Sequence, residues 1–236
     1  MLHLLGAIID YYVFNPIIKD NTRFNELTSA KCGRRISLVI IYPAIPSIKY
    51  LIYSHGNRST IINGFDYWKS ISNQAQCNVI IYDYIGYGLS ESIRPSEQNC
   101  YNSLETVMDY VLITLKVPSS DIILIGRSLG TSIVVNYVAK QNWTYPIMLI
   151  SPYKSICTVV IDYWPISLID KFNSDQKISK LRCPVKIIHG MDDDFISIDH
   201  SKILYSKLYD KTFDPVWMPN ADYYIELLCY KKLNNK

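Results

Sequence analysis

The segment of this 236-residue chain whose residue types best suit covalent chemistry centres on Ser128. It reads Gly126-Arg127-Ser128-Leu129-Gly130, a G-x-S-x-G pattern in which a sharp turn presents the serine as a nucleophile. Glycines on both sides suit such a turn, because the backbone bends tightly and passes close to neighbouring chain. A nucleophilic serine also needs a general base and donors for the developing oxyanion. The pattern predicts acyl chemistry at Ser128.

That turn needs a strand before it and a helix after it, and the flanking residues supply both. Residues 121–125 (DIILI) form a short apolar run, and residues 131–140 have a helix-like pattern. Runs that suit strands recur at residues 35–42, 50–54, 78–82, 146–150, 185–189 and 214–218. Further helices are predicted at residues 65–74, 96–115 and 197–209. This alternation predicts a doubly wound, mostly parallel α/β sheet.

One domain is expected to account for most of the chain. With 49% hydrophobic and 19% charged residues, 236 residues can bury one sizeable core. We predict an N-terminal arm or helix packed on the domain at residues 1–34, and a single α/β domain at residues 35–236. A short lid is predicted at about residues 152–183, where apolar and aromatic side chains favour an acyl chain as ligand. The same side chains could instead simply cover the edge of the sheet.

Four predicted strands are followed by glycines and polar residues. In an open α/β sheet, ligands bind outside the carboxyl ends of the strands. The four ends read HGN at residues 55–57, DYIGYGLS at 83–90, Ser128 itself, and GMDDD at 190–194. Any one of them alone could be only a turn. Their joint order predicts a site at this edge of the sheet.

These blocks resemble the α/β-hydrolase superfamily, and more closely its compact branch of acyl-protein thioesterase-like (depalmitoylase-like) serine hydrolases. The resemblance rests on YSHGN at residues 53–57, YDYIGYGLS at 82–90, PSEQN at 95–99, GRSLG at 126–130, Ser151-Pro152, and His189-Gly190 followed by Asp193. It extends from about residue 35 to residue 228. It implies the α/β-hydrolase fold and hydrolysis of acyl esters or thioesters.

The resemblance assigns roles to particular positions. Ser128 is the expected nucleophile, and Asp193 is the expected acid of the triad. The backbone N–H groups of Leu129 and Asn57 are expected to form the oxyanion hole. The position of the family's histidine is occupied by Asp222, in a segment that also lacks the family's glycines. Because a carboxylate is a far weaker base than an imidazole, this replacement implies an impaired or lost activity.

Another histidine could serve as the base, and the chain has four. His200, seven positions beyond Asp193 and in a predicted helix, and His55, on the predicted oxyanion loop, are the leading alternatives. His189 is predicted to end a strand as a satisfied core histidine. His3 lies in the apolar N-terminal stretch, where a structural role is expected.

Several other classes of function find no support in the sequence. A net charge of +3 with scattered basic residues argues against nucleic-acid binding. The six cysteines are dispersed without a CxxC pair, which favours a reducing, intracellular and cytoplasmic setting. The aspartates at 192–194 and 222 match no calcium-loop spacing, so we expect no metal and no cofactor.

The N-terminal stretch is apolar but is interrupted by Asp10 and Pro16. It has no basic region and no small-residue cleavage site, so a signal peptide is not expected. A contact of this stretch with a membrane surface stays open as an alternative to packing on the core.

Two functions remain from the residues and the resemblance together. The first is a serine hydrolase acting on acyl esters or thioesters through Ser128, impaired by Asp222. The second is a non-catalytic protein of the same fold that binds an acyl or lipid ligand or a protein partner.

Overall fold

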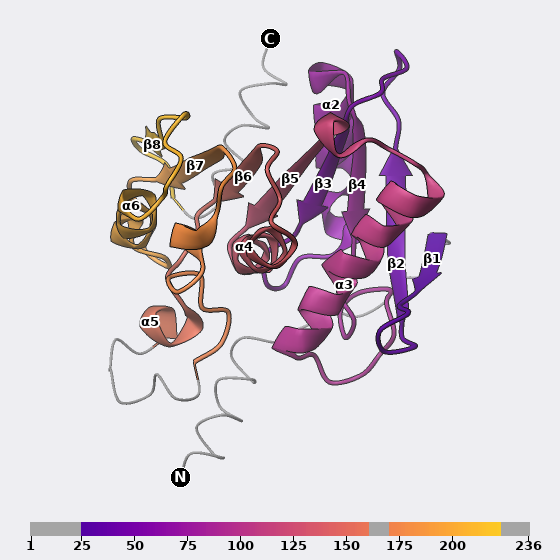
Figure 1. Ribbon diagram of the computed structural model, residues 1–236, viewed down its shortest axis with the longest axis horizontal. Coiled ribbons are helices and arrows are strands. Elements are labelled where there is room, and N and C mark those ends of the chain that lie inside the picture. The colour runs from indigo at the N-terminus through magenta and orange to yellow at the C-terminus, as the bar shows by residue number, and fades with distance from the viewer. Residues whose placement is uncertain (1–24, 161–169, 223–236) are drawn as a thin grey trace.

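An eight-stranded sheet, ordered β1-β2-β4-β3-β5-β6-β7-β8, forms the centre of the computed structural model in the residues that it describes, 25–160 and 170–222 (Figure 1). The strands are β1 (Asn25–Thr28), β2 (Arg35–Ile41), β3 (Tyr50–Ser54), β4 (Asn78–Tyr82), β5 (Ile122–Arg127), β6 (Ile147–Ile150), β7 (Val185–Gly190) and β8 (Val216–Met218). β1 pairs antiparallel with β2, and β2 with β4, whereas the pairings from β4 through β8 are parallel. The doubly wound, mostly parallel sheet predicted from the sequence is confirmed.

Helices cover both faces of this sheet, because its central strands are apolar on both sides. The α-helices in the described ranges are α2 (Ile61–Ala75), α3 (Glu97–Asp109), α4 (Leu129–Gln141), α5 (Ile156–Val160) and α6 (Ile198–Ser206). Tyr53 and Ile81 pack on one face with Trp68 of α2. Ile52 and Ile80, their neighbours along the same strands, pack on the other face in a cluster that includes residues of α3, α4 and α6. The alternation of side chains along a strand thus divides the core into two layers.

Side-chain caps set the starts of α2, α3 and α6. The Ser96 hydroxyl accepts a hydrogen bond from the Asn99 N–H at 3.1 Å and so caps α3, whose predicted start at residue 96 lies one residue from the observed one. A π-helix at Tyr110–Thr114 continues α3 to nearly the predicted end. α2 begins at Ile61, four residues earlier than predicted, because Thr60 caps it.

β1 and the predicted lid differ from what the sequence predicted or add to it. β1 was not predicted, since its sequence NELT is mostly exposed and has no apolar run; it precedes the expected boundary at residue 35 and pairs with β2. In the predicted lid, Tyr153 and Ile156 are buried in the main core. Residues 161–169 of that lid and residues 1–24 of the N-terminal arm lie outside the described residues.

Candidate active site

The turn that holds Ser128 is strained and tightly packed. Ser128 lies between β5 and α4 with φ 48° and ψ −117°, a positive φ that an L-residue adopts only at a cost of about 1–3 kcal/mol. A Cβ on Gly126 would lie 2.7 Å from the carbonyl carbon of Gly130, and a Cβ on Gly130 would lie 2.6 Å from that of Ser54. Only glycines fit at these two positions. The turn therefore has the geometry that G-x-S-x-G predicts.

The loop after β3 lies directly against this serine. β3 and β5 are parallel neighbours, with Ser54 opposite Gly126, so their carboxyl ends meet at the same edge. A Cβ on Gly56 would lie 3.5 Å from the Cβ of Ser128. The next residue, Asn57, accepts a hydrogen bond from the Tyr87 hydroxyl on its side-chain oxygen at 3.1 Å.

The predicted second oxyanion donor is the backbone N–H of Leu129. Leu129 is the first residue of α4, where backbone N–H groups have no partner within the helix and the helix dipole favours negative charge. The structure thus brings Asn57, Leu129 and Ser128 to one edge of the sheet.

Asp193 is buried, unlike the exposed Asp192 and Asp194 on either side. Its Oδ1 accepts hydrogen bonds from the N–H groups of Phe195 at 3.0 Å and Ile196 at 2.7 Å. Its Oδ2 is also buried and has no hydrogen-bond partner among the residues that the structure describes. Two backbone N–H groups therefore fix this carboxylate in orientation, and its Oδ2 lies 3.3 Å from His189 Nε2, which is also buried.

Asp222 follows β8 and is exposed. Its backbone carbonyl packs against the end of β7, where a Cβ on Gly190 would lie 2.8 Å from the Asp222 oxygen. The N–H of Asp192 donates to the carbonyl of Ala221 at 3.0 Å. Position 222 is thereby held at the same sheet edge as the loop that carries Asp193.

His189 and His200 each contact other groups of the fold. His189 Nδ1 is 2.5 Å from the Ser201 hydroxyl and its Nε2 donates to the Ile196 carbonyl at 2.9 Å, so the predicted satisfied core histidine is confirmed. His200 stands in the first turn of α6, and its Nδ1 is 3.5 Å from the N–H of Lys154. His3 lies outside the described residues.

His55, the other alternative base, is almost completely buried. Its Nδ1 lies 2.8 Å from the carbonyl of Gly56, and its Nε2 lies 3.8 Å from Asp83 Oδ1. Burial lowers the pKa of His55 to about 4, which weakens the ring as a proton acceptor. Both its environment and its orientation disfavour His55 as the base. Asp83, which the sequence analysis placed at a strand end without a role, is thus part of the same neighbourhood.

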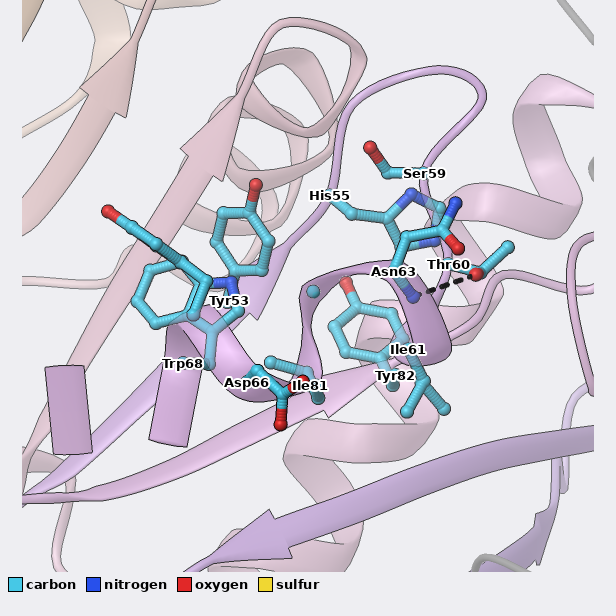
Figure 2. Close-up of a pocket in the computed structure, with 12 residues that line it drawn as sticks. Tyr53, His55, Ser59, Thr60, Ile61, Asn63, Asp66, Trp68, Ile81 and Tyr82 are labelled. Carbon is cyan, nitrogen blue, oxygen red and sulfur yellow. Dashed lines mark hydrogen bonds between the residues drawn. The ribbon is translucent and has the colours of Figure 1, made fainter. Parts of the chain in front are cut away.

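A cavity of about 300 Å³ opens on the α2 side of the His55 loop (Figure 2). Tyr53, Trp68 and Ile81 form its apolar wall, while Thr60 and Asn63 from the start of α2 contribute polar atoms. The residues that line it do not include Ser128. The cavity therefore adjoins the predicted oxyanion loop through His55 and Ser59, without reaching Ser128.

The described residues contain neither a cluster of potential metal ligands nor a helix suited to span a membrane. Over the described ranges 25–160 and 170–222, no group of three or more His, Cys, Asp or Glu side chains is placed to hold a metal ion. In those same ranges, no helix is long and apolar enough to cross a membrane.

Three curated proteins that are similar in sequence to this chain carry alpha/beta hydrolase in their names. No protein-family model matches the chain. It is 46% identical over 206 residues to the putative alpha/beta hydrolase L404 of Acanthamoeba polyphaga mimivirus, covering 85% of this chain and 78% of that protein. It is 30% identical to alpha/beta hydrolase domain-containing protein 17B of Xenopus laevis, across 83% of this chain and 67% of that protein. It is 29% identical to alpha/beta hydrolase domain-containing protein aho-3 of Caenorhabditis elegans, of which it spans only 58%.

The fold has close counterparts among solved structures. An esterase of Pyrococcus furiosus, Pf2001, superimposes with a TM-score of 0.71 over 94% of this chain and 95% of that one, at 15% sequence identity. An identity this low shows a shared architecture and not a shared activity.

Proposed function

This chain belongs to the α/β-hydrolase family and has the α/β-hydrolase fold, and from that premise we propose that it is a serine hydrolase of acyl esters or thioesters with an impaired general base. The observation that carries the proposal is the strained turn at Ser128, with φ 48°, packed against the Gly56 loop. A backbone strain of this kind persists only where the surroundings enforce it, and it is concentrated at functional sites.

The proposed reaction follows from this geometry. Ser128 Oγ attacks the acyl carbonyl carbon, and its proton passes to a base. The N–H groups of Leu129 and Asn57 hold the oxyanion, a contribution that typically lowers the barrier by about 3–4 kcal/mol per donor. The tetrahedral intermediate expels the alcohol or thiol, which takes up the proton. Water then attacks the acyl-serine ester and releases the carboxylic acid and free Ser128.

The base is the weak part of this machinery. A general base contributes about 10²–10⁴-fold to rate, and the carboxylate of Asp222 cannot match an imidazole in this role. The expected acid partner is fixed by two backbone N–H groups, and its Oδ2, which lies 3.3 Å from His189 Nε2, accepts no hydrogen bond from any described residue. The backbone at position 222 packs against Gly190 at the end of β7, and Asp193 lies three residues beyond Gly190 in the loop that follows. A histidine at position 222 is therefore expected to find a partner in Asp193.

The side chains near Asp193 support an acyl group as substrate. Met191 and Phe195, which flank Asp193 in the same loop, are 52% and 63% exposed. Apolar side chains at such an edge favour a hydrocarbon chain over a charged group. The thioesterase-like preference and the degenerate triad both remain part of the proposal.

A second function, ligand binding without catalysis, is favoured by one observation. His55 and His189 direct their rings at other partners within the core, so neither supplies the base. If position 222 also fails as a base, the fold retains its serine turn without turnover. It would then bind an acyl or lipid ligand, or a protein partner.

Labelling with a serine-directed fluorophosphonate probe tests the two functions. We expect slow labelling of the wild type at neutral pH and none of Ser128→Ala. We expect Asp222→His to raise the labelling rate and the hydrolysis of a p-nitrophenyl ester by about 10²-fold or more, since a positioned base contributes on this scale.

Asp222→Asn is the matched control, because it removes the charge without adding an imidazole. Equal gains in Asp222→His and Asp222→Asn would show that charge, and not the missing base, limits the reaction. Absence of labelling in the wild type and in Asp222→His would instead support the binding function. Loss of a native activity in His200→Ala would identify His200 as the base and refute the assignment of position 222.

A further inference from the structure

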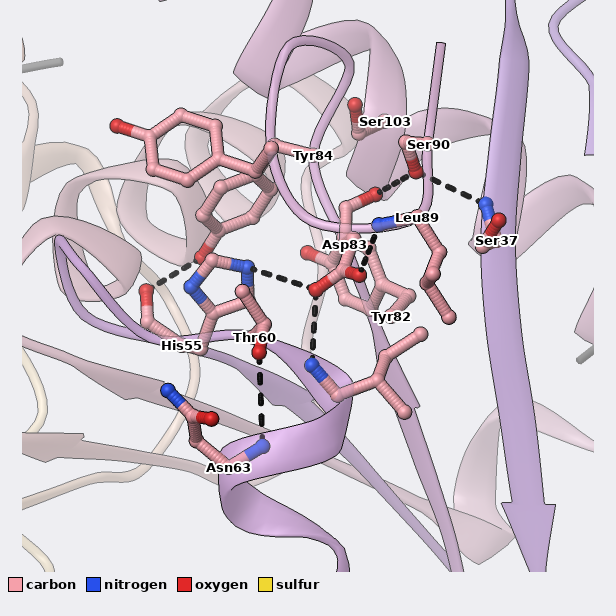
Figure 3. Close-up of polar contacts among 12 residues, drawn as sticks. Ser37, His55, Thr60, Asn63, Tyr82, Asp83, Tyr84, Leu89, Ser90 and Ser103 are labelled. Carbon is pink, nitrogen blue, oxygen red and sulfur yellow. Dashed lines mark hydrogen bonds and ion pairs between the residues drawn. The ribbon is translucent and has the colours of Figure 1, made fainter. Parts of the chain in front are cut away.

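The side chains of His55 and Asp83 meet in the core (Figure 3). His55 Nε2 lies 3.8 Å from Asp83 Oδ1, and their side chains are only 4% and 0% exposed. Neither is one of the reacting groups proposed above. Because His55 precedes Asn57 by two residues, its position bears directly on the oxyanion loop.

The hydrogen bond of His55 to the main chain decides its tautomer. Nδ1 lies 2.8 Å from the Gly56 carbonyl, and a carbonyl can only accept a hydrogen bond, so Nδ1 carries the proton. In the neutral ring, Nε2 then holds a lone pair. Nε2 is buried and has no hydrogen-bond partner among the described residues. The ring therefore turns an electron pair towards the carboxyl group of Asp83.

The carboxyl group cannot move away from that electron pair. Asp83 Oδ1 accepts a hydrogen bond from the N–H of Ile61, at the start of α2, at 2.8 Å. Oδ2 accepts one from the N–H of Leu89, also at 2.8 Å. Gly88, with φ 46°, closes the remaining side so tightly that a Cβ there would overlap the carboxyl group. Asp83 is thus anchored from both ends of its carboxyl group (Figure 3).

We propose that protonation of Asp83 beside the His55 ring positions the loop of residues 55–60 against Ser128. With the proton on the carboxyl group, the Nε2 lone pair, 3.8 Å from Oδ1, faces an uncharged group. Without it, a lone pair and a carboxylate face each other in a medium of low dielectric, which is costly. The loop is then expected to shift. The catalytic meaning of that shift depends on the proposed function, whereas the protonation of Asp83 does not.

Burial acts on the two groups in a consistent way. It lowers the pKa of His55 to about 4 and raises the pKa of Asp83 to about 6, against the opposing effect of the two backbone hydrogen bonds to Asp83. Both directions favour uncharged partners, a neutral imidazole beside a carboxyl group. The pair is therefore expected to take up its proton near pH 6.

Other titratable groups surround the pair on every side. Tyr84 stacks on the His55 ring with centroids 4.1 Å apart, and Tyr87 meets its edge at 5.7 Å. From β5, the Arg127 guanidinium approaches Gly56, where a Cβ would lie 3.2 Å from Nη1. Asp66 of α2 and Tyr82 of β4 line the cavity that the ring also lines. Burial raises the pKa of Tyr84 and Tyr87 well above the usual value, so neither titrates near pH 6.

The same tyrosines connect the ring to the loop. The Tyr84 hydroxyl donates to the carbonyl of His55 at 2.6 Å, and the Tyr87 hydroxyl donates to the Asn57 side chain at 3.1 Å. A displacement of the His55 ring is therefore transmitted to Asn57 through contacts on both sides. His55 and Asp83 act as positioning residues.

The stability of two single variants tests the protonation states of Asp83 and His55. The folded pKa of Asp83 is raised from 3.8, so its stabilising contribution is present below pH 3.8 and is lost as the pH rises through about 6. The folded pKa of His55 is lowered from 6.5, so its contribution is present above pH 6.5 and is lost as the pH falls through about 4. Between pH 4 and 6 the two effects oppose each other in the wild type.

Each variant removes one effect and leaves the other. As the pH rises from 4 to 6, the unfolding equilibrium constant of Asp83→Asn is expected to fall about 10²-fold relative to that of the wild type. Over the same range, the constant of His55→Asn is expected to rise about 10²-fold relative to that of the wild type. Asparagine at position 55 keeps a donor in the place of Nδ1–H. Urea unfolding at several pH values measures both slopes. Parallel slopes in the two variants would overturn the proposal.

Nuclear magnetic resonance of the wild type tests the positioning without relying on activity or on the variants. The ¹⁵N shift of His55 Nε2 and the amide signals of Gly56 and Asn57 are expected to titrate together near pH 6. In Asp83→Asn the amide signals are expected not to titrate there. Signals of Gly56 and Asn57 that stay constant from pH 5 to 7 in the wild type would refute the positioning role, even if Ser128 reacts with the probe. A protein that shows the titration but no labelling would support the positioning role of Asp83 and His55 and reject the proposed hydrolase.

Discussion

Replacement of Gly130 by alanine gives the sharpest test of how the serine turn is built. A Cβ at this position would lie 2.6 Å from the carbonyl carbon of Ser54 and 2.9 Å from the carbonyl oxygen of His55. Both atoms belong to the backbone at the end of β3, so no side-chain rotation relieves the overlap. Because carbon atoms pack at about 3.5–4.0 Å, the start of α4 must move by about 1 Å relative to β3.

The expected cost of this displacement follows from measured overpacking. Overfilled cores typically lose about 1–3 kcal/mol, and in a chain of this size each kcal/mol lowers the melting temperature by about 2–4 °C. We therefore expect Gly130→Ala to melt about 2–12 °C below the wild type. The same 1 Å shift separates the Leu129 N–H from the Asn57 loop, and misplacement on this scale can reduce reaction rates by about 10²-fold.

Gly64→Ala is the matched control. Gly64 lies within α2, and a Cβ there would lie 3.3 Å from Cδ1 of the Trp68 side chain. Alanine in a helix interior is favoured over glycine by about 0.5–1 kcal/mol, which offsets this tight contact. Circular dichroism gives the two melting temperatures, and the fluorophosphonate probe gives reactivity at Ser128. Equal melting temperatures of Gly130→Ala and Gly64→Ala, with Gly130→Ala reacting with the probe as fast as the wild type, would refute this prediction. The close packing of α4 on β3 would then not shape the site.

Two further predictions concern the frame around the site. Glu105, which is almost fully buried, contacts Lys31 and accepts a hydrogen bond from Lys140 at 2.6 Å. Because both lysines are about half exposed, Glu105→Gln is expected to lower the free energy of unfolding by only about 1–2 kcal/mol, measured in urea at low salt. An unchanged urea midpoint would contradict this. Ser96→Ala is expected to lose about 1 kcal/mol with the cap of α3, whereas Ser96→Asp should retain it; equal losses in both variants would show that the hydroxyl is not acting as a cap.

The sequence was most informative where one local pattern sufficed. The strands of the parallel sheet were predicted to within one or two residues, because continuous apolar runs mark strands buried on both faces. The position of the Ser128 turn followed from its glycines. β1 was missed because NELT has no apolar run and depends on β2 for its pairing.

Tertiary contacts decided the parts that could not be predicted. Nothing local distinguishes Asp193 from its two aspartate neighbours, since its burial results from the N–H groups that surround it in the folded loop. The start of α2 at Ile61 depends partly on Asp83, which lies far away in the sequence and accepts the Ile61 N–H. The His55–Asp83 pair likewise joins two strand ends that no sequence spacing connects.

The parallel pairing of β3 with β5 has a consequence for the kinetics of folding. Ser54 and Gly126 are register partners, yet α2, β4 and α3 all lie between them in the chain. Closing so long a loop is slow, because chain entropy is lost before any contact forms. Gly130 can dock on Ser54 only after that closure. Ser128 is therefore expected to acquire its strained turn late in folding, after β3 and β4 have paired.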